Sequence, residues 1–447
     1  MERDLTTGSV FKNIVYFSLP YLLSYFLQTL YGLADLFIAG QFYGADCITA
    51  VSVGSQVMHM VTVMIVGLAM GSTVLIARAV GGKDLRQASR TVGNTISLFM
   101  GVSVALTVLL LLFVKPIVAV MSTPQEAVAG TVTYLTICFI GIPFITAYNI
   151  ISSIFRGLGD SKSPMYFIAI ACGANILLDY VFIGGLHLGA AGAALGTTLS
   201  QTLSVIVALW VVIRRKSGIV LKRQDFRLQK ITIQQILKIG MPVALQDGFV
   251  QISFIVITVI ANRRGLSDAA AVGIVEKIIS LVFLVPSTML STVSALSAQN
   301  IGAGKHDRAA ATLRYAICMA IGFGLVIGTV TQFAGGDMVG LFTADATVVM
   351  MGEQYIRSYI WDCAIAGIHF CFSGYFCAYG MSGIPFLYTI LSIICVRIPG
   401  AYFASLYFPD NLYPMGLAAP GGSLLSVIVC LIAFTVLRRC GKLKKYD

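Results

Sequence analysis

The sequence predicts an all-α integral membrane protein with twelve transmembrane helices in two pseudo-symmetric six-helix lobes. Its composition, its apolar runs and an internal repeat predict this fold. Of the 447 residues, 57% are hydrophobic and only 11% are charged, whereas soluble domains carry about 25% charged residues. Apolar runs of roughly 20 residues, the length that crosses the hydrocarbon core of a bilayer, recur along the whole chain. A transmembrane β-barrel would instead show short alternating segments, and these do not dominate here.

The apolar runs are separated by charged, glycine or proline breaks. We expect no removable signal peptide before them, because no small-residue cleavage site follows a short apolar core. Spans are predicted near residues 14–39, 48–77, 91–113, 130–155, 163–184, 190–213, 236–261, 271–299, 311–334, 350–377, 385–406 and 416–437.

The basic residues, which give a net charge of +11, fill the even-numbered loops and the tails. The sixth loop, "RRKSGIVLKRQDFRLQK", is the most basic, and the C-terminus adds five more lysines and arginines. By the positive-inside rule both termini are cytoplasmic, which an even number of spans requires. The charge is therefore a topology signal and no nucleic-acid partner is expected. The sixth loop also divides the chain into an N-terminal lobe (1–213), a basic cytoplasmic loop (214–235) and a C-terminal lobe (236–447).

The two halves resemble each other at three places. "SLPYLLSYFLQTLYGLAD" aligns with "GMPVALQDGFVQISFIV" (Pro20 on Pro242), "IARAVGGKDLRQAS" with "SAQNIGAGKHDRAA", and "FRGLGDSKSPM" with "FCAYGMSGIPF". All three pairings have an offset close to 222 residues, which argues against chance similarity between apolar helices. Six spans per half make the repeats parallel, related by an axis along the membrane normal. Such repeats are typical of secondary transporters, whose sites lie in or between the lobes.

Four polar residues of the first half are expected at one depth of the membrane. Asp35 lies in the outer half of span one, and Asn175 and Asp179 lie one helical turn apart in the outer half of span five. Thr197 comes about two turns into span six as it returns from outside. Ionisable groups within spans are costly and are functional candidates by default. Two carboxylates, an amide and a hydroxyl favour a site for a proton or Na⁺, with loop capping or a structural hydrogen bond as the alternative.

The second half contains other polar residues in predicted spans. Glu276 and Lys277 are adjacent and face different sides, so a structural ion pair with other helices is an equal alternative. Asp362 and His369 are seven residues apart on one face and could relay protons. The remaining candidates are Gln251 and Arg397, of which Arg397 and Pro399 fall where Asn175 and Asp179 would lie in this half.

Patterns for other chemistries are missing from the sequence. The ten cysteines are scattered, mostly within apolar runs, with neither metal-ligand spacing nor a disulfide framework. No G-x-x-x-x-G-K-[ST] loop is present, which excludes a Walker-type nucleotide site in this chain. We therefore expect no enzyme activity, no cofactor, and no bound metal beyond Na⁺ at Asp35, Asn175, Asp179 and Thr197.

The chain resembles the multidrug and toxic compound extrusion (MATE) family over essentially its whole length. The resemblance is carried by "FSLP" followed fifteen positions later by an acid, "ARAVGGKDLRQA", "RGLGDSKSPM", "NILLD", "GAAGAALGTTLSQ" and "QNIGAGKHDRA". It implies a V-shaped pair of lobes that exports organic, often cationic, compounds in exchange for H⁺ or Na⁺. By position, Asp35, Asn175, Asp179 and Thr197 match the first-lobe cation site of the family, and Pro20 matches a proline linked to bending of the first helix.

The resemblance favours the DinF-like or archaeal-like branch. Members of the NorM-like branch use a glutamate on span seven, where this chain has Gln251, and an aspartate about one turn from Asp362. We therefore expect ion coupling in the N-terminal lobe of a plasma-membrane protein. Its partners would be the lipid bilayer and small amphipathic organic cations, and we expect a monomer. The alternatives are a flippase for lipids or lipid-linked metabolites of the same superfamily, and a non-transporting receptor or scaffold.

Overall fold

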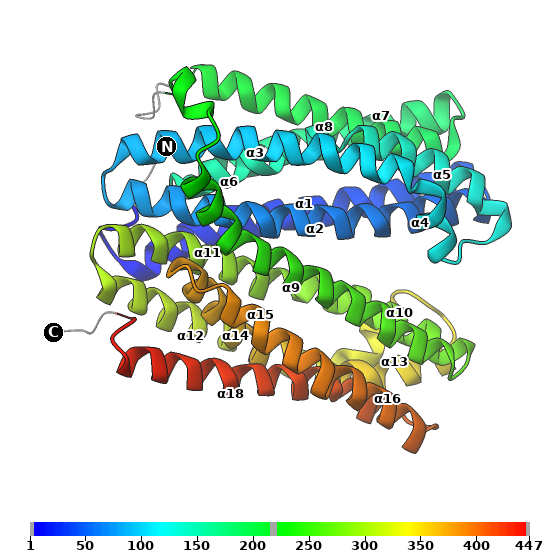
Figure 1. Ribbon diagram of the computed structural model, residues 1–447. Helices are drawn as coiled ribbons and strands as arrows, with labels where there is room; N and C mark the ends of the chain where they lie inside the picture. The colour runs from blue at the N-terminus through cyan, green and yellow to red at the C-terminus, as the bar shows by residue number, and fades with distance from the viewer. Residues whose placement is uncertain (1–3, 215–220, 444–447) are drawn as a thin grey trace. The chain divides into compact units, whose positions relative to one another are not determined.

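The protein is described by a computed structural model that covers residues 4–214 and 221–443 (Figure 1). Every regular element within these residues is a helix, as the sequence predicts. Residues 215–220 of the predicted basic loop, and Lys444 and Lys445 of the basic tail, lie outside the described residues.

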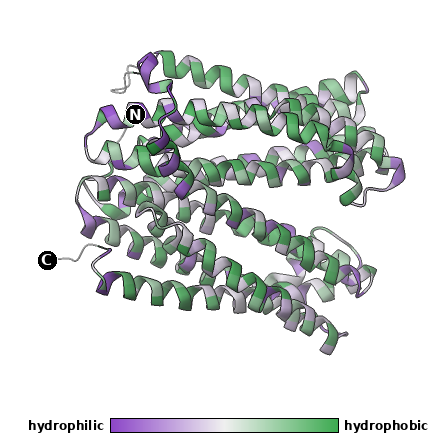
Figure 2. Ribbon diagram, in the orientation of Figure 1, coloured by the Kyte–Doolittle hydropathy of each residue, from purple (hydrophilic) through white to green (hydrophobic). Residues whose placement is uncertain are grey.

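Ten helices of the described chain are long and apolar enough to cross a membrane, and two bent pairs bring the number to twelve if each is one span. Hydrophobic residues cover most of the helix lengths, while hydrophilic residues gather at the ends and in the connections (Figure 2). The prediction of a multi-pass protein with twelve spans is therefore confirmed. The observed helices extend several residues beyond the apolar runs, because helical hydrogen bonding continues past the hydrocarbon-length segment.

The predicted fourth and tenth spans are each broken. Helices α5 (Gln125–Ile140) and α6 (Ile142–Gly157) meet at 49°, and α13 (Ala346–Tyr359) and α14 (Asp362–Ala378) meet at 40°. The first bend falls at Gly141, which is followed two residues later by Pro143, a residue that cannot donate a backbone hydrogen bond. The sequence prediction missed both bends because the apolar runs continue through them.

Two compact units make up the chain, and each has its own apolar core. The first unit contains Leu19–Gly240 and the second contains Asp4–Ser18 and Met241–Asp447. The further helices of the first unit are α2 (Ala45–Gly81), α3 (Leu85–Leu112), α4 (Val114–Val120), α7 (Lys162–Asp179), the π-helix η1 (Tyr180–Gly185), α8 (Gly189–Arg214) and the 3₁₀ turn η2 (Arg223–Phe226). Those of the second unit are α10 (Leu266–Val282), α11 (Leu284–Gly302), α12 (His306–Gly340), α15 (Gly383–Ser392), the π-helix η3 (Ile393–Arg397), α16 (Ile398–Tyr407), α17 (Tyr413–Gly416) and α18 (Ala418–Arg439).

Two helices are divided between the units. In α1 (Val10–Phe42) the boundary falls between Ser18 and Leu19, one residue before Pro20. In α9 (Lys230–Asn262) it falls between Gly240 and Met241, one residue before Pro242. Each helix therefore changes unit beside one of the two repeat-related prolines, where a backbone hydrogen bond is lost.

The first part of α9 packs closely on α2 within the first unit. A Cβ atom built on Gly71 would collide with the carbonyl oxygen of Ile236, and one on Gly240 would collide with that of Leu68. Only glycine permits the helix backbones to approach this closely in the α2–α9 contact.

The start of α1 packs in the second unit, where Ile14 and Phe17 are fully buried in the cluster that also holds residues of α11.

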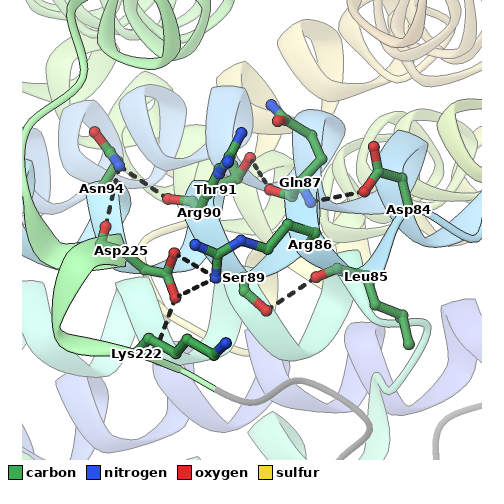
Figure 3. Close-up of polar contacts among 10 residues, drawn as sticks. All are labelled: Asp84, Leu85, Arg86, Gln87, Ser89, Arg90, Thr91, Asn94, Lys222 and Asp225. Atoms are coloured by element: carbon green, nitrogen blue, oxygen red, sulfur yellow. Dashed lines mark hydrogen bonds and ion pairs between the residues drawn. The ribbon is translucent and has the colours of Figure 1, made fainter.

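A polar cluster fixes the segment that precedes α9 to the first turns of α3 (Figure 3). The Asp225 side chain is 1% exposed and pairs with Arg86, 3.1 Å away, while accepting a hydrogen bond from the Lys222 backbone N–H. Asn94 donates to the Asp225 carbonyl oxygen at 3.1 Å and accepts from the Gln229 N–H at 2.6 Å. One carboxylate and one amide thus satisfy backbone groups of a segment that has little regular structure.

The second unit holds the N-terminal segment in a similar way. Arg308, which corresponds to Arg86 at an offset of 222, donates to the carbonyl oxygens of Gly8 at 2.9 Å and Thr7 at 3.1 Å. Lys305 donates to the carbonyl oxygen of Thr6 at 2.8 Å. The repeat therefore extends from the helices to the segments that precede the first helix of each half.

Candidate functional site

Four polar side chains meet between three helices of the first unit. Asp35 comes from α1, Asn175 and Asp179 from α7, and Thr197 from α8. Asp35 is 2% exposed, and Asn175 and Asp179 are fully buried. The Thr197 hydroxyl donates to Oδ2 of Asp35 at 3.1 Å. The structure therefore brings together all four residues that the sequence analysis places at one depth.

Local features of α7 and α8 create this arrangement. Asn175 and Asp179 are four residues apart and so share one face of α7. A π-helix, η1, begins directly after Asp179, and such turns are frequent at functional sites because they alter the direction of side chains. Gly196 of α8 lies against the Asp179 carboxylate, and a Cβ atom there would collide with Oδ1 and lie 3.6 Å from Nδ2 of Asn175. The missing side chain of Gly196 leaves room for the carboxylate.

A second polar pair lies one helical turn from the first. Tyr31 precedes Asp35 by four residues, Gln201 follows Thr197 by four, and the two side chains lie near each other. Helices α1 and α8 therefore carry polar side chains at two successive turns, and the Thr197–Asp35 hydrogen bond joins them at one of these turns. The sequence analysis did not select Tyr31 or Gln201, although their i±4 spacing from Asp35 and Thr197 is the signal that could have found them.

The site is rich in unsatisfied oxygen atoms. Within the described chain, both carboxylate oxygens of Asp179, Oδ1 of Asp35 and the Asn175 amide have no hydrogen-bond partner. No ion pair between described residues involves either aspartate, and the two carboxylates lie within electrostatic reach of each other. Two buried carboxylates without a counter-ion are costly. The arrangement therefore calls for a cation.

The donor set indicates which cation would fit. Described residues form no group of three or more His, Cys, Asp or Glu side chains that could hold a metal ion. The oxygens of two carboxylates, one amide and one hydroxyl instead suit a hard monovalent cation or a proton shared between the acids. Transition metals prefer nitrogen and sulfur ligands.

Some of the polar candidates of the second unit lie in one region around Arg397. Arg397 donates to the Tyr359 hydroxyl at 2.7 Å and lies 4.6 Å above the Phe254 ring. Glu276 accepts from the Thr258 hydroxyl at 3.3 Å. Glu276 and Asp362 both lie within electrostatic reach of Arg397. Tyr359 and Phe254 were not expected from the sequence, because aromatic residues are common throughout membrane helices.

The remaining candidates are separate from both groups. Lys277 is exposed, and Gln251 is half-buried on α9. His369 is buried, but its Nδ1 atom has no hydrogen-bond partner in the described chain, so it does not hydrogen-bond Asp362 through this nitrogen. Pro20 lies within α1, which continues past it.

Comparisons with known proteins agree with this fold. The MatE family matches residues 20–181 and 242–403, one stretch in each half. The chain is 28% identical over 400 residues to the probable multidrug resistance protein YpnP of Bacillus subtilis, covering 89% of this chain and 88% of the relative. It is 27% identical over 368 residues to the multidrug export protein MepA of Staphylococcus aureus, covering 82% and 81%.

Solved structures have the same fold. A crystal structure of MATE in complex with MaL6 superposes with a TM-score of 0.92 at 23% identity, and the match covers 99% of both chains. An outward-facing multidrug resistance MATE family transporter of the MOP superfamily gives a TM-score of 0.91 at 23% identity, covering 99% of this chain and 98% of that one.

The apolar helices, the MatE match in each half and the similarity to a multidrug export protein define a multi-pass helical membrane transporter rather than an enzyme. Because the matched family stretches cover most of the chain and recur at an offset of 222 residues, the chain belongs to the MatE family.

Proposed function

We propose that this protein is a secondary active multidrug efflux antiporter, driven by inward H⁺ or Na⁺ flux through the first unit. The observation that carries the proposal is the pair of buried carboxylates, Asp35 and Asp179, which lack a cationic partner in the described chain. Export of organic compounds is supported by the names of the relatives, a multidrug resistance protein and a multidrug export protein.

Ion binding would act through the packing of three helices. A proton or Na⁺ that enters from outside is held by Asp35 and Asp179, with the oxygens of Asn175 and Thr197 completing its ligands. Binding removes the repulsion between the carboxylates and draws α1 toward α7 and α8. The neutralised site changes the packing of α1, weakens the binding of the drug and favours the inward-facing state. Release of the cation to the cytoplasm restores the charge and favours binding of new substrate.

The expected substrates are small amphipathic organic compounds, mainly cations. A cation-driven antiporter benefits when substrate and coupling ion compete for the same negative charge. The placement of basic residues supports cytoplasmic termini. The protein would work as a monomer in the plasma membrane.

Efflux of a fluorescent cationic dye tests this function. Cells that express the wild type should lose the dye under an imposed inward H⁺ or Na⁺ gradient, and Asp179→Asn should abolish the gradient-driven part. Asp46→Asn is the matched control, because Asp46 is exposed at the start of α2, and it should behave as the wild type. Equal efflux by Asp179→Asn and wild type, at equal protein levels, would refute coupling through the first unit.

A further inference from the structure

Residues 221–231, which we call the strap, lie at a membrane surface of the first unit. They come between α8 and α9, and both helices are long and apolar enough to cross a membrane. The strap therefore runs across one end of the helices of this unit (Figure 1). Trp210 is 53% exposed one turn before Arg214, whose guanidinium lies 4.2 Å from the centre of its ring. Exposed tryptophan and arginine side chains are typical of the level at which a span leaves the hydrocarbon core.

The backbone of the strap is fixed to α3. Besides the contacts of Asp225 with Arg86 and Asn94 described above, the Ser97 hydroxyl donates to the carbonyl oxygen of Phe226 at 2.8 Å. A Cβ atom on Gly93 would collide with the backbone of Asp225, so the strap lies directly on the helix. The side chains that point away from α3 are therefore held at defined positions on the surface.

Four large apolar side chains of the strap are exposed. Their exposed fractions lie between 36% and 72%, for Leu221, Phe226, Leu228 and Ile231. Because the strap is fixed at the end of the membrane spans, these side chains can enter the boundary between headgroups and acyl chains. Apolar side chains at this level stabilise the attachment of a segment to a membrane surface.

Four basic side chains alternate with the apolar ones and are also exposed: Lys222, Arg223, Arg227 and Lys230. None of them takes part in an ion pair between described residues. Asp225 is the one acid of the strap, and its side chain is 1% exposed and paired with Arg86. The surface of the strap therefore has four positive charges and no exposed acid.

The corresponding segment of the second unit is held without such charges. At the repeat offset of 222, residues 4–9 correspond to residues 226–231, and they contain no lysine or arginine. Leu5, which corresponds to Arg227, is 1% exposed. The basic residues that hold this segment, Lys305 and Arg308, come from the helix end beneath it. The repeat architecture thus needs no basic side chains within the segment, so those of the strap serve contacts outside the unit.

The combination of charges and apolar side chains indicates what the strap contacts. The positive-inside rule accounts for basic residues in this loop, but it requires no exposed apolar side chains between them. A nucleic acid or an acidic protein would supply no apolar phase at the end of the spans. Anionic phospholipids supply both parts, a phosphate for the basic side chains and an acyl boundary for the apolar ones.

We propose that the strap is a docking surface for anionic phospholipids. Its four basic side chains contact the headgroup phosphates, and its four apolar side chains enter the acyl boundary beside them. Fixation to α3 through Asp225 makes the surface ready before a lipid arrives. This interaction goes beyond the proposed transport function and is independent of which ion drives it.

Quenching of a tryptophan in the strap by brominated lipids tests the proposal. The chain has two tryptophans, and Trp210→Phe with Trp361→Phe removes both. Adding Phe226→Trp then places a single reporter at an exposed aromatic position of the strap. The purified protein is placed in vesicles of phosphatidylcholine and phosphatidylglycerol, and either lipid is brominated in turn. The relative binding constant should favour phosphatidylglycerol by about fivefold or more, the contribution expected from a single basic side chain at an anionic surface.

Charge variants separate the strap from the net charge of the protein. In the reporter background, Arg223→Gln with Arg227→Gln should lower the preference to about twofold or less. The matched control is Arg439→Gln with Lys442→Gln, which removes two exposed charges from the second unit and should leave the preference unchanged. Arg223→Lys with Arg227→Lys keeps the charges and should retain most of it.

The remaining outcomes would overturn the proposal. Equal quenching by the two lipids, or an unchanged preference in the double glutamine variant, means that the strap does not select anionic lipids. An equal loss in the control pair means that only net charge matters. Loss of the preference on addition of inorganic phosphate at constant ionic strength means that the strap binds soluble phosphate instead. If the double glutamine variant does not fold, Arg223→Gln and Arg227→Gln are measured singly, and an unchanged preference in both overturns the proposal.

Discussion

The hydroxyl of Thr197 donates a hydrogen bond to the carboxylate of Asp35 across 3.1 Å, joining residues 162 positions apart in the chain. This bond connects α8 to α1 directly at the buried acid. Because Asp35 is buried, the bond orients the carboxylate, whose other oxygen has no partner in the described chain and remains free for a cation.

Replacing Thr197 with valine should weaken cation binding while leaving the fold intact. Valine has nearly the shape of threonine but lacks the hydroxyl, and a hydrogen bond to a charged group contributes about 1.5–3 kcal/mol. The cation concentration for half-maximal transport should therefore rise about tenfold to a hundredfold, and Thr197→Ser should largely restore it. Thr202→Val is the control, since the Thr202 hydroxyl bonds the carbonyl oxygen of Thr198. A Thr197→Val protein with unchanged cation dependence would contradict this account of the site.

Gly196→Ala should impair coupling, because the new methyl group collides with the Asp179 carboxylate. Misplacing a functional group by about 1 Å can reduce activity on the order of a hundredfold. Gradient-driven efflux should therefore fall by about tenfold or more. The matched control is Gly173→Ala on α7, where a Cβ atom would meet nothing within 4 Å. That variant should transport normally and gain up to about 1 kcal/mol of stability from higher helix propensity. Equal transport by the two variants would mean that Asp179 needs no fixed position.

Arg264 should be a structural residue of the second unit, in contrast to its neighbour Arg263. Its guanidinium lies 2.6 Å from Asp268 and donates to the carbonyl oxygens of Phe408 and Pro409 beyond the end of α16. Removal of one partner from a buried ion pair costs about 3–5 kcal/mol. Arg264→Ala should therefore lower the Tm of the purified protein by several degrees, whereas Arg263→Ala, at an exposed position, should change it little. Arg264 lies between the predicted seventh and eighth spans, in an odd-numbered loop where the positive-inside rule expects few basic residues, and these contacts explain its presence there. Similar Tm values for the two alanine variants would argue against the structural role.

Arg86→Ala should loosen the segment before α9 with only a modest loss of stability. Asp225 would lose its partner, but the Arg86 side chain is 42% exposed, so water can replace part of the interaction. The expected cost is on the order of 1 kcal/mol. Limited proteolysis should cut the segment faster in Arg86→Ala than in Arg90→Ala, which removes a half-buried arginine one turn further along α3. Equal cleavage rates would mean that Asn94 and the backbone hold the segment without Arg86.

The sequence predicted the residues of the site better than the path of the backbone around it. Asp35 and Asp179 stand out because acids are rare in apolar runs, and Asn175 and Thr197 follow from spacing and family resemblance. Tyr31 and Gln201 were missed because uncharged polar residues carry no such contrast. The bend at Gly141 and the docking of Asp225 depend on contacts with distant segments, and local sequence contains no information about those partners.

Ion-driven transport in reconstituted vesicles tests the central claim most directly. Purified wild-type protein and the Asp35→Asn/Asp179→Asn variant are placed in liposomes, and export of a cationic dye is measured under a Na⁺ gradient or a pH gradient alone. The account predicts that one of the two gradients accelerates export by the wild type and that neither accelerates export by the variant, although the variant still binds the dye. Acceleration of the variant equal to that of the wild type would contradict the assignment of coupling to Asp35 and Asp179.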